Sequence, residues 1–301
     1  MNKHLLKMSD LSKDDINDIL DLADKLKEYN KNNITHHILK GKTLGMIFTK
    51  SSTRTRVSFE VGMYQLGGQA LFLSANDLQL NRGEPISDTA KVLSRYLDGI
   101  MIRTFAQKDV DDLAKYGTIP VINGLTDYAH PCQVLADLMT VREYRGKLEG
   151  LKLCFIGDGF NMANSLIVGG LTAGMNVSFA SPKNYEPTQD IIDFTKNYQG
   201  KFTLTNDVKE AASDADVLIT DVWYSMGQSD LEDRKIIFKD YKIDSETMKY
   251  AKPDAMVLHC LPAHRDEEIS SEVLEAHEAE IFDEAENRLH AQKAVMVKLM
   301  G

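Results

Sequence analysis

Short apolar runs alternate with helix-patterned segments along most of the chain, and this alternation limits the possible folds more than any other feature. Four runs lie in the first half, at residues 43–48, 70–73, 99–102 and 119–122. Five more lie in the second half, at residues 151–156, 177–180, 202–205, 217–220 and 256–259. An amphipathic helical pattern, which begins after Ser12, precedes the first run. Runs of this length between helical patterns are typical of parallel strands with helices on both faces of the sheet, so we predict an α/β fold with two doubly wound parallel sheets.

The break between the two sets of strands predicts two domains. A chain of 301 residues is longer than one hydrophobic core usually supports. Segment 145–150 contains two glycines and follows a helical pattern over 130–144. We expect a first domain over 1–147 and a second over 148–284, facing each other across a cleft and joined by inter-domain helices. The apolar face of 285–301 predicts a last helix that packs back on the first domain.

The composition of the chain excludes several classes of protein. No window approaches the roughly 20 apolar residues of a membrane-spanning helix, and the first ten residues lack the apolar core of a signal peptide, so we expect a cytoplasmic protein without membrane association. Cys132, Cys154 and Cys260 form no CxxC pair, which fits a reducing compartment. A formal net charge of −10 disfavours a nucleic-acid surface and favours small anionic ligands held by a local positive cluster.

The segment 50–56 is the best candidate for such a cluster. It follows the first apolar run and precedes a helical pattern, and the turn from a strand into a helix leaves backbone N–H groups that can bind an anion. Hydroxyl and guanidinium donors crowd the segment: Ser52, Thr53, Arg54, Thr55 and Arg56. Guanidinium groups match two oxygens of a phosphate or carboxylate. We predict an anion pocket here, and the alternative is an ordinary helix N-cap followed by solvated arginines.

Three further side chains of the first half are candidates for the same site. Arg103 closes a buried run, where strand ends meet a ligand crevice; a rim arginine paired with a surface carboxylate is the alternative. His130 and Gln133 stand at a helix start and can donate to, or orient, a carbonyl group; a surface histidine at an ordinary helix start is the alternative. Cys132 lies between them, and we expect it to pack rather than to act as a nucleophile.

The second half contains a glycine-bearing turn that resembles part of a dinucleotide fingerprint. Segment 157–165 follows a strand and opens a helix, but it lacks the third glycine. The next strand also ends without the acidic residue that binds a ribose, so we do not expect a nicotinamide cofactor. Asn161 in this turn is a candidate amide partner for a zwitterionic ligand, against the alternative of a structural asparagine.

A loop with the single tryptophan follows the strand at 217–220. Asp221 is a candidate partner for an ammonium group, and Ser225 with the neighbouring backbone is a candidate partner for a carboxylate. The alternative is a capping aspartate with Trp223 packed against the loop.

A cysteine and two histidines follow the last strand of the second half. Asp221 is expected beside Cys260 across adjacent strand ends, so we interpret this thiol as a polar contact to substrate rather than a covalent nucleophile. His259 and His264 have no third ligand at metal spacing, so we expect no metal site. Arg288, which precedes the helical pattern of the C-terminus, is another candidate for anion binding.

Five segments, in this order and at these distances, give the chain an end-to-end resemblance to the ornithine carbamoyltransferase family. They are SSTRTR at 51–56, HPCQ at 130–133, DVWYSMGQ at 221–228, HCLP at 259–262 and ENRLH at 286–290. The first two motifs are shared by carbamoyltransferases generally, including the aspartate enzymes. The SMG loop and HCLP mark the ornithine branch, so the expected substrate depends on these two.

The resemblance implies the residues that bind each substrate. Carbamoyl phosphate is expected to contact Ser52, Thr53, Arg54, Thr55, Gln79, Arg103, His130, Gln133 and Arg288, with backbone help from Cys260 and Leu261. Ornithine is expected to contact Asn161, Asp221, Ser225 and Met226. The implied catalytic residues are Arg54, Thr55, Arg103, His130, Gln133 and Cys260. Gln79 is expected to come from a neighbouring subunit of a homotrimer with shared active sites, and trimers can assemble further.

The resemblance also implies a reaction without a cofactor. The neutral δ-amine of ornithine attacks the carbamoyl carbon, a tetrahedral oxyanion forms, and phosphate leaves to give citrulline. A carbamoyltransferase for putrescine or a modified ornithine, a non-catalytic amino-acid-binding protein on the same fold and, more distantly, a nicotinamide oxidoreductase are the alternatives. The sequence does not distinguish the biosynthetic from the degradative direction, because both use the same site.

Overall fold

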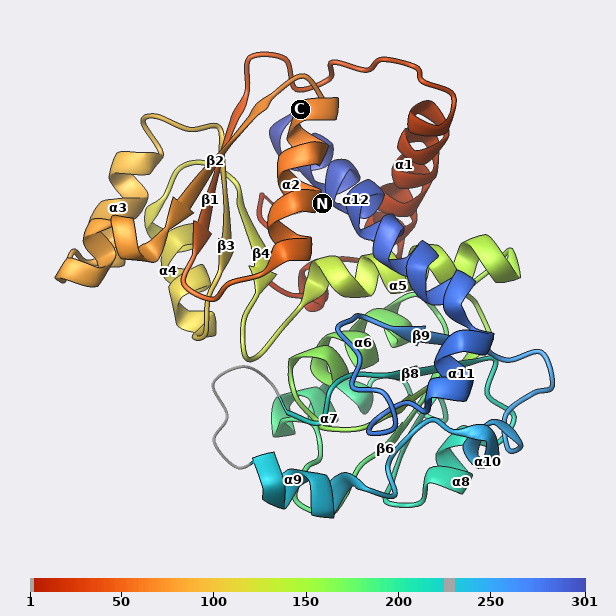
Figure 1. Cartoon of the computed structure of the whole chain (residues 1–301). Helices are drawn as coiled ribbons and strands as arrows, with labels where there is room; N and C mark the ends of the chain where they lie inside the picture. Colours follow the sequence, from red (N-terminus) through yellow and green to blue (C-terminus); the bar gives the residue numbers. More distant parts are fainter. Residues whose placement is uncertain (1–2, 225–230) are drawn as a thin grey trace. The chain divides into compact units, whose positions relative to one another are not determined.

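The computed structural model describes residues 3–224 and 231–301, apart from the side chains of residues 80 and 81, and it forms two compact units (Figure 1). Unit 1 comprises Met1–Met139 and Asn287–Gly301, and unit 2 comprises Thr140–Glu286. Each unit contains one all-parallel sheet with helices, which confirms the predicted α/β fold class. Within the described ranges, no helix is both long and apolar enough to span a membrane.

The sheet of unit 1 has four strands in the order β2-β1-β3-β4. Their bounds are β1 (Thr43–Phe48), β2 (Gln69–Ser74), β3 (Gly99–Arg103) and β4 (Val121–Leu125). The strand predicted at 119–122 begins two residues later and ends three residues later, because Pro120 has no N–H to donate and regular pairing begins after it. The chain adds β2 on one side of β1 and β3 on the other. The carboxyl ends of β1 and β3 therefore meet at the switch point where ligands bind in such sheets.

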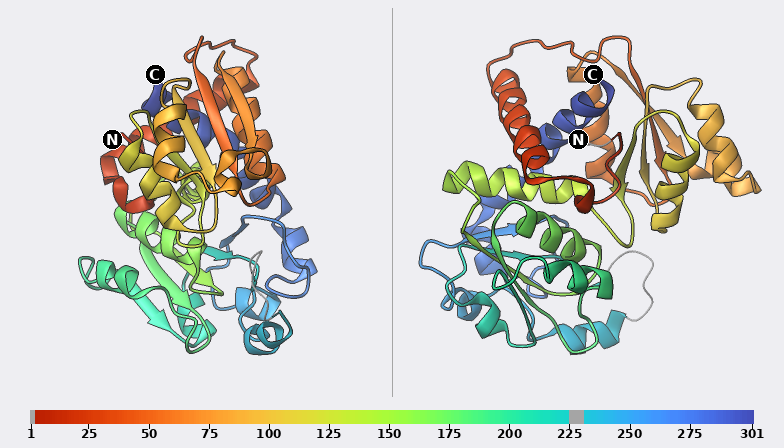
Figure 2. Two further views of the ribbon diagram at one scale, coloured as in Figure 1. Left: turned by 90° about the vertical axis from the view of Figure 1, so that its left-hand side faces the viewer. Right: turned by 180° about the vertical axis from the view of Figure 1, so that it is seen from behind.

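Helices cover both faces of this sheet. They are α1 (Lys13–Lys31), α2 (Thr53–Gln65), α3 (Ile86–Leu93), α4 (Gln107–Tyr116) and the parts of α5 (Pro131–Arg145) and α12 (Glu278–Met300) that belong to unit 1, with short 3-10 turns at Met8–Asp10, Ala75–Asp77 and Gln79–Arg82. α3 and α4 lie on one side of the strands, and α2 and α12 lie on the other (Figures 1 and 2). Gly62 lets α2 approach α12 closely, since an added Cβ would lie 2.9 Å from Cε of Met296.

Three helix starts test the sequence predictions. α1 begins after Ser12 as expected, with the Ser12 hydroxyl accepting the Asp15 N–H and the Asp15 carboxylate accepting the Ser12 N–H. α2 begins at Thr53, so the predicted anion segment is itself the first helical turn. α12 begins at Glu278, so the prediction that Arg288 precedes the last helix was wrong. Acidic residues in the first turn stabilise this early start through the helix dipole, a signal that apolar periodicity does not contain.

The sheet of unit 2 has five strands in the order β7-β6-β5-β8-β9. Their bounds are β5 (Lys152–Ile156), β6 (Asn176–Ala180), β7 (Phe202–Thr205), β8 (Val217–Thr220) and β9 (Met256–His259). The helices of this unit are α6 (Asn161–Thr172), α7 (Gln189–Thr195), α8 (Val208–Ala212), α9 (Leu231–Phe238), α10 (Ser245–Met248) and α11 (Ser271–Ala276). Between β5 and β6, Phe155 stacks on Phe179 with ring centroids 5.6 Å apart. The switch point lies between β5 and β8, so residues just after these strands share one edge of the sheet.

A lysine is buried in the helical layer of unit 1. Lys293 of α12 has no exposed surface, and its Nζ donates to Oε1 of Gln65 at 2.9 Å. No carboxylate among the described residues forms an ion pair with it. Burial lowers the pKa of Lys293 from 10.5 to about 8. The ammonium group therefore opposes folding at neutral pH.

We predict that Lys293→Met stabilises the protein at neutral pH by about 1–3 kcal/mol. Between about pH 8 and 10.5 the unfolded chain binds more protons at this position than the folded chain, so the wild type gains stability as the pH rises. The advantage of the variant should therefore shrink above about pH 8. Urea unfolding at several pH values measures both effects. Lys298→Met, which alters a lysine paired with Asp18, is the control, and a destabilised Lys293→Met protein at neutral pH would contradict the prediction.

Candidate active site

The first turn of α2 presents donors just beyond the carboxyl end of β1. The Ser52 hydroxyl accepts the Thr55 N–H at 3.2 Å, and the Ser52 carbonyl accepts the Arg56 N–H. The N–H groups of Thr53 and Arg54 have no hydrogen-bond partner within the described ranges. Two backbone donors at the positive end of a helix form a binding position for an anion.

The Thr55 hydroxyl is the centre of the side-chain cluster. It is fully buried and accepts hydrogen bonds from Nη1 of Arg103 at 3.4 Å and from Nη2 of Arg288 at 3.0 Å. The Ser52 hydroxyl lies 3.1 Å away on the same side. Thr55, Arg103 and Arg288 come from α2, the end of β3 and the middle of α12. Three segments far apart in the sequence thus meet at one position, where two of them supply guanidinium groups to the hydroxyl of the third.

His130 lies beside this cluster as a buried, neutral imidazole. Burial lowers its pKa well below the usual value, and the positive charges of Arg288, Arg103, Lys50 and Arg54 lower the pKa further. A neutral imidazole still offers one N–H donor and one acceptor nitrogen. It can therefore hydrogen-bond a carbonyl oxygen without carrying a charge of its own.

Gln133 and Lys50 have their orientation set by carboxylates. Nε2 of Gln133, in the first turn of α5, donates to Oδ1 of Asp137 at 2.8 Å, and both side chains are fully buried. Nζ of Lys50 lies 3.2 Å from Oδ1 of Asp127. Asp137 was not among the residues predicted from the sequence, and Lys50 was predicted only as the first residue of the anion segment. The signal that identifies Asp137 is its position one helical turn after Gln133, where side chains share a face.

Two predicted residues, Arg56 and Gln79, have no described side-chain hydrogen bond to the cluster around Thr55. Nε of Arg56 donates to Glu60 at 3.0 Å, and the Arg56 guanidinium stacks on the Phe72 ring at 3.7 Å. The Arg56 guanidinium is thus paired with a carboxylate, whereas the sequence predicted it as a donor to an anion. Gln79 is exposed in a 3-10 turn, and no described hydrogen bond joins its side chain to the cluster.

A cavity of about 890 Å³ opens at the start of α2. Ser52 and Thr53 line it together with Arg56, and Phe48, Phe72 and Phe105 supply apolar walls. This volume and this mixture of polar groups and apolar walls are typical of a site for a small molecule.

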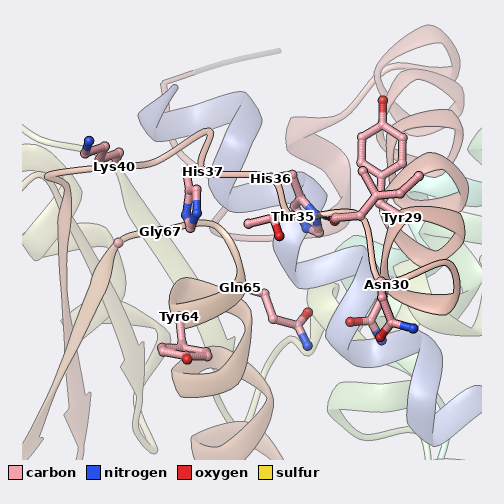
Figure 3. Close-up of a pocket in the computed structure, with 12 residues that line it drawn as sticks. Tyr29, Asn30, Thr35, His36, His37, Lys40, Tyr64, Gln65 and Gly67 are labelled. Carbon is pink, nitrogen blue, oxygen red and sulfur yellow. Dashed lines mark hydrogen bonds between the residues drawn. The ribbon is translucent and has the colours of Figure 1, made fainter.

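A second cavity in unit 1 contains none of the predicted site residues. It has a volume of about 650 Å³ and lies at the carboxyl ends of α1 and α2 (Figure 3). The side chains of Tyr29, His36, Tyr64 and Gln65 line it. Burial lowers the pKa of His36, whose Nδ1 lies 2.9 Å from the Ile34 carbonyl oxygen.

Polar groups of unit 2 gather where β8 and β9 end. Thr220 of β8 pairs with His259 of β9, so the residues that follow these strands are neighbours. Sγ of Cys260 donates to Oδ1 of Asp221 at 3.0 Å, and the Val222 N–H donates to the same oxygen at 2.8 Å. The predicted proximity of Asp221 and Cys260 is confirmed. The pair can bind a ligand through a carboxylate and a thiol.

The other predicted residues of unit 2 that the structure describes are Leu261, which follows Cys260 in the chain, and Asn161, which follows β5, the strand beside β8. The Leu261 N–H donates to Nδ1 of His259 at 2.9 Å, so the backbone group that Leu261 offers a ligand is its carbonyl oxygen. Asn161 is buried at the start of α6, which follows β5 at the switch point. Ser225 and Met226, predicted to contact the second substrate, lie outside the described residues.

Two parallel-sheet units with polar groups at the switch point of each sheet define a class of α/β enzymes that bind ligands beyond the strand ends. Comparison with known proteins identifies the family within this class. The chain belongs to the aspartate/ornithine carbamoyltransferase family, since residues 3–143 match its carbamoyl-P binding domain and residues 149–299 match its Asp/Orn binding domain.

Individual relatives resemble the chain over nearly its whole length. Ornithine carbamoyltransferase of Thermococcus kodakarensis is 51% identical, over 99% of this chain and 96% of its own length. The Carboxydothermus hydrogenoformans enzyme of the same name is 52% identical, over 99% of this chain and 98% of its own length. The solved structure of ornithine carbamoyltransferase from Pyrococcus furiosus is 50% identical, has a TM-score of 0.94 and covers 99% of this chain and 97% of its own.

We predict that His130 contributes to acid destabilisation of the fold. The unfolded chain protonates this histidine as the pH falls through about 6.5, whereas the folded chain keeps it neutral, so stability is lost below that pH. In His130→Gln the loss of stability between about pH 7.5 and 5.5 should be smaller, by up to about 1.4 kcal/mol per pH unit.

Thermal or urea unfolding across this pH range measures the effect. The exposed His37→Gln variant is the matched control and should follow the wild type. Equal acid sensitivity of His130→Gln and the wild type would contradict a neutral His130.

Proposed function

We propose that this chain is an ornithine carbamoyltransferase, which transfers the carbamoyl group of carbamoyl phosphate to the δ-amine of L-ornithine and gives L-citrulline and phosphate. The observation that carries the proposal is the assembly of Thr55, Arg103 and Arg288 with neutral His130 at the start of α2. This cluster provides positive charge for a phosphate beside a neutral donor for a carbonyl oxygen. Relatives of that name at 51% and 52% identity support the choice of substrate.

Each substrate is assigned to one domain. Residues 1–147, with 285–301, form the carbamoyl-phosphate-binding domain, and residues 148–284 form the ornithine-binding domain. The break between the two family matches, at 3–143 and 149–299, supports the boundary near residue 147, and the inclusion of Asn287–Gly301 in unit 1 supports the assignment of the last helix.

In the first domain the phosphate is bound at the N-terminus of α2. The donors are the backbone of the first turn and the side chains of Ser52, Thr53, Arg54, Thr55, Arg103 and Arg288, with Gln79 from a neighbouring subunit. Arginine forms charge-assisted, often bidentate, hydrogen bonds with phosphate oxygens. This set of donors stabilises the phosphate both as part of the substrate and as the leaving group.

The carbamoyl group is held by its oxygen and by its nitrogen. Thr55, Arg103 and His130 donate to the carbonyl oxygen, which becomes an oxyanion when the amine attacks; one such donor is typically worth about 3–4 kcal/mol. The carbamoyl nitrogen needs acceptors. Gln133, whose Nε2 is held by Asp137, offers its amide oxygen, and Cys260 and Leu261 offer backbone carbonyl oxygens.

Ornithine is bound in the second domain. Asp221 accepts hydrogen bonds from the α-ammonium group, and Asn161, Ser225 and Met226 complete the contacts of the zwitterion, with the Cys260 thiol as a further polar contact. In the reaction the bond from the δ-nitrogen to the carbamoyl carbon forms, the bond from that carbon to the phosphate oxygen breaks, and the proton lost by the amine passes to the departing phosphate. These steps need no cofactor.

We further propose a homotrimer with shared active sites. Measurement of the oligomeric state in solution distinguishes a single trimer from a larger assembly of trimers. An apolar face on α2 and the edge strand β2 supports a subunit interface, because Val57, Val61, Tyr64 and Phe72 are all exposed there. Cys132, Cys154 and Cys260, all among the described residues, form no disulfide, which supports a cytoplasmic location. Relatives named anabolic support arginine biosynthesis as the physiological direction.

We predict that Arg54→Ala lowers kcat/KM for carbamoyl phosphate by about 100- to 1,000-fold, because one charged donor to the phosphate is lost. Citrulline formation from carbamoyl phosphate and ornithine measures this, and an unchanged Tm shows that the variant folds. Arg95→Ala, which alters an exposed arginine of the same unit, is the control and should keep its activity.

The same assay separates the alternatives. Faster ureido-product formation from putrescine or a modified ornithine than from ornithine would reassign the substrate. Absence of turnover together with ornithine binding would indicate a binding protein, and calorimetric binding of NAD would indicate an oxidoreductase.

We predict that kcat/KM for ornithine rises toward alkaline pH, by up to about tenfold per pH unit, because only the neutral δ-amine attacks and an alkyl ammonium has a pKa near 10. His130 stays neutral over this range, so its titration does not oppose the rise. Initial rates between about pH 7 and 9 at constant ionic strength measure the profile. A flat profile would contradict this mechanism.

A further inference from the structure

We propose that His264, Glu267 and Glu268 form a binding site for one divalent transition-metal ion, Zn²⁺ or Mn²⁺, in unit 2. A ligand atom of each of these residues lies within 4.8 Å of those of the other two. Nδ1 of His264 lies 3.7 Å from Oε2 of Glu268. The expectation that no third ligand lies near His264 at metal spacing is therefore not met, because Glu267 and Glu268 bring carboxylates beside its ring.

The orientation of the three side chains leaves one donor atom on each for a metal. Oε1 of Glu268 accepts the His264 N–H at 2.6 Å and the His259 ring N–H at 3.0 Å, and Oε1 of Glu267 lies 2.9 Å from Nζ of Lys235. The remaining atoms are Oε2 of both glutamates and Nδ1 of His264. All three are buried and have no hydrogen-bond partner among the residues that the structure describes.

The charge of Glu268 points to a cation as the missing partner. This side chain has no exposed surface, and its ion-pair partners within the described ranges are two histidines, His259 and His264, rather than a lysine or arginine. The Leu261 N–H donates to Nδ1 of His259, so Nε2 is the ring nitrogen that donates to Glu268. A buried carboxylate is costly unless a positive charge lies against it. A metal ion at Oε2 supplies that charge.

The geometry is within reach of metal coordination. Donors of a tetrahedral zinc ion, bound at about 2.0–2.2 Å, lie roughly 3.3 Å from one another. The pair at 3.7 Å is close to this spacing, and the wider spacings close by rotation of His264 and Glu267, whose side chains are 35% and 25% exposed. Glu268 is the fixed ligand, held by the His259 ring and the His264 N–H.

The donor set selects the kind of metal. One imidazole nitrogen with carboxylate oxygens suits Zn²⁺ or Mn²⁺, whereas Ca²⁺ and Mg²⁺ take oxygen ligands alone and Cu⁺ prefers sulfur. The ion would brace the turn that follows Cys260. It would also fix the His264 ring, which stacks on Tyr224 with centroids 4.9 Å apart. The site is separate from the Cys260 thiol, and the inference does not depend on the proposed reaction.

Titration of the whole, tag-free and chelator-treated protein with Zn²⁺ and with Mn²⁺ by calorimetry tests the proposal. We expect saturable binding of one ion per chain and a higher Tm with the ion bound. His264→Ala and Glu267→Gln should each weaken binding by at least about tenfold, a loss that even an outer partner of a metal ligand can cause. Glu268→Gln alters the fully buried ligand and carries the risk of a folding defect. The side chains of His264 and Glu267 are partly exposed, so their variants test the site without that risk.

Two controls distinguish this site from others. His277→Ala alters a histidine that lies 2.7 Å from Glu280 at the same three-residue spacing, and Cys260→Ser removes the nearby thiol. Both should keep wild-type metal affinity. Binding of Co²⁺ without a thiolate charge-transfer band would support the nitrogen and oxygen ligands. Absence of saturable binding, unchanged affinity in both His264→Ala and Glu267→Gln, or loss of binding in Cys260→Ser would overturn the proposal.

Discussion

The contact of one buried hydroxyl with two arginines is the interaction on which the first unit depends. Thr55 in α2 accepts hydrogen bonds from Arg103 at the end of β3 and from Arg288 in α12. Burying two guanidinium groups is unfavourable unless they have hydrogen-bond partners, and the Thr55 hydroxyl is a partner that both arginines share. The C-terminal helix, which belongs to unit 1 over Asn287–Gly301, therefore brings Arg288 to the same hydroxyl as Arg103.

Parallel strands explain why the polar side chains meet at all. In unit 1 the ends of β1 and β3 bring the start of α2 beside Arg103, and in unit 2 the ends of β8 and β9 bring Asp221 beside Cys260. Each pair lies at a sheet edge where neighbouring strands finish together. The sheet therefore sets the spacing of the ligand-binding groups, and the loops supply their chemistry.

Burial of charge has three different consequences in this molecule. At His130, burial beside arginines keeps the imidazole neutral, which suits a donor to a developing oxyanion. At Lys293, burial without a carboxylate leaves a cation that opposes folding. At Glu268, a buried carboxylate with histidine partners favours binding of a cation. The same desolvation cost thus accompanies a neutral hydrogen-bond donor, a destabilising lysine and a carboxylate that favours a cation, depending on the neighbours.

The sequence by itself determined the α/β class, the strands of both sheets to within three residues, the N-cap at Ser12 and the position of the anion segment at the start of α2. These features follow from local patterns, namely apolar periodicity, capping residues and strand-to-helix turns. Only the tertiary structure decided that Thr55 joins Arg103 to Arg288, that Arg56 pairs with Glu60, and that Arg288 lies inside a helix. The contact between Arg288 and Thr55, 233 positions apart, depends on how the helices pack on the sheet, and local sequence patterns do not predict that packing.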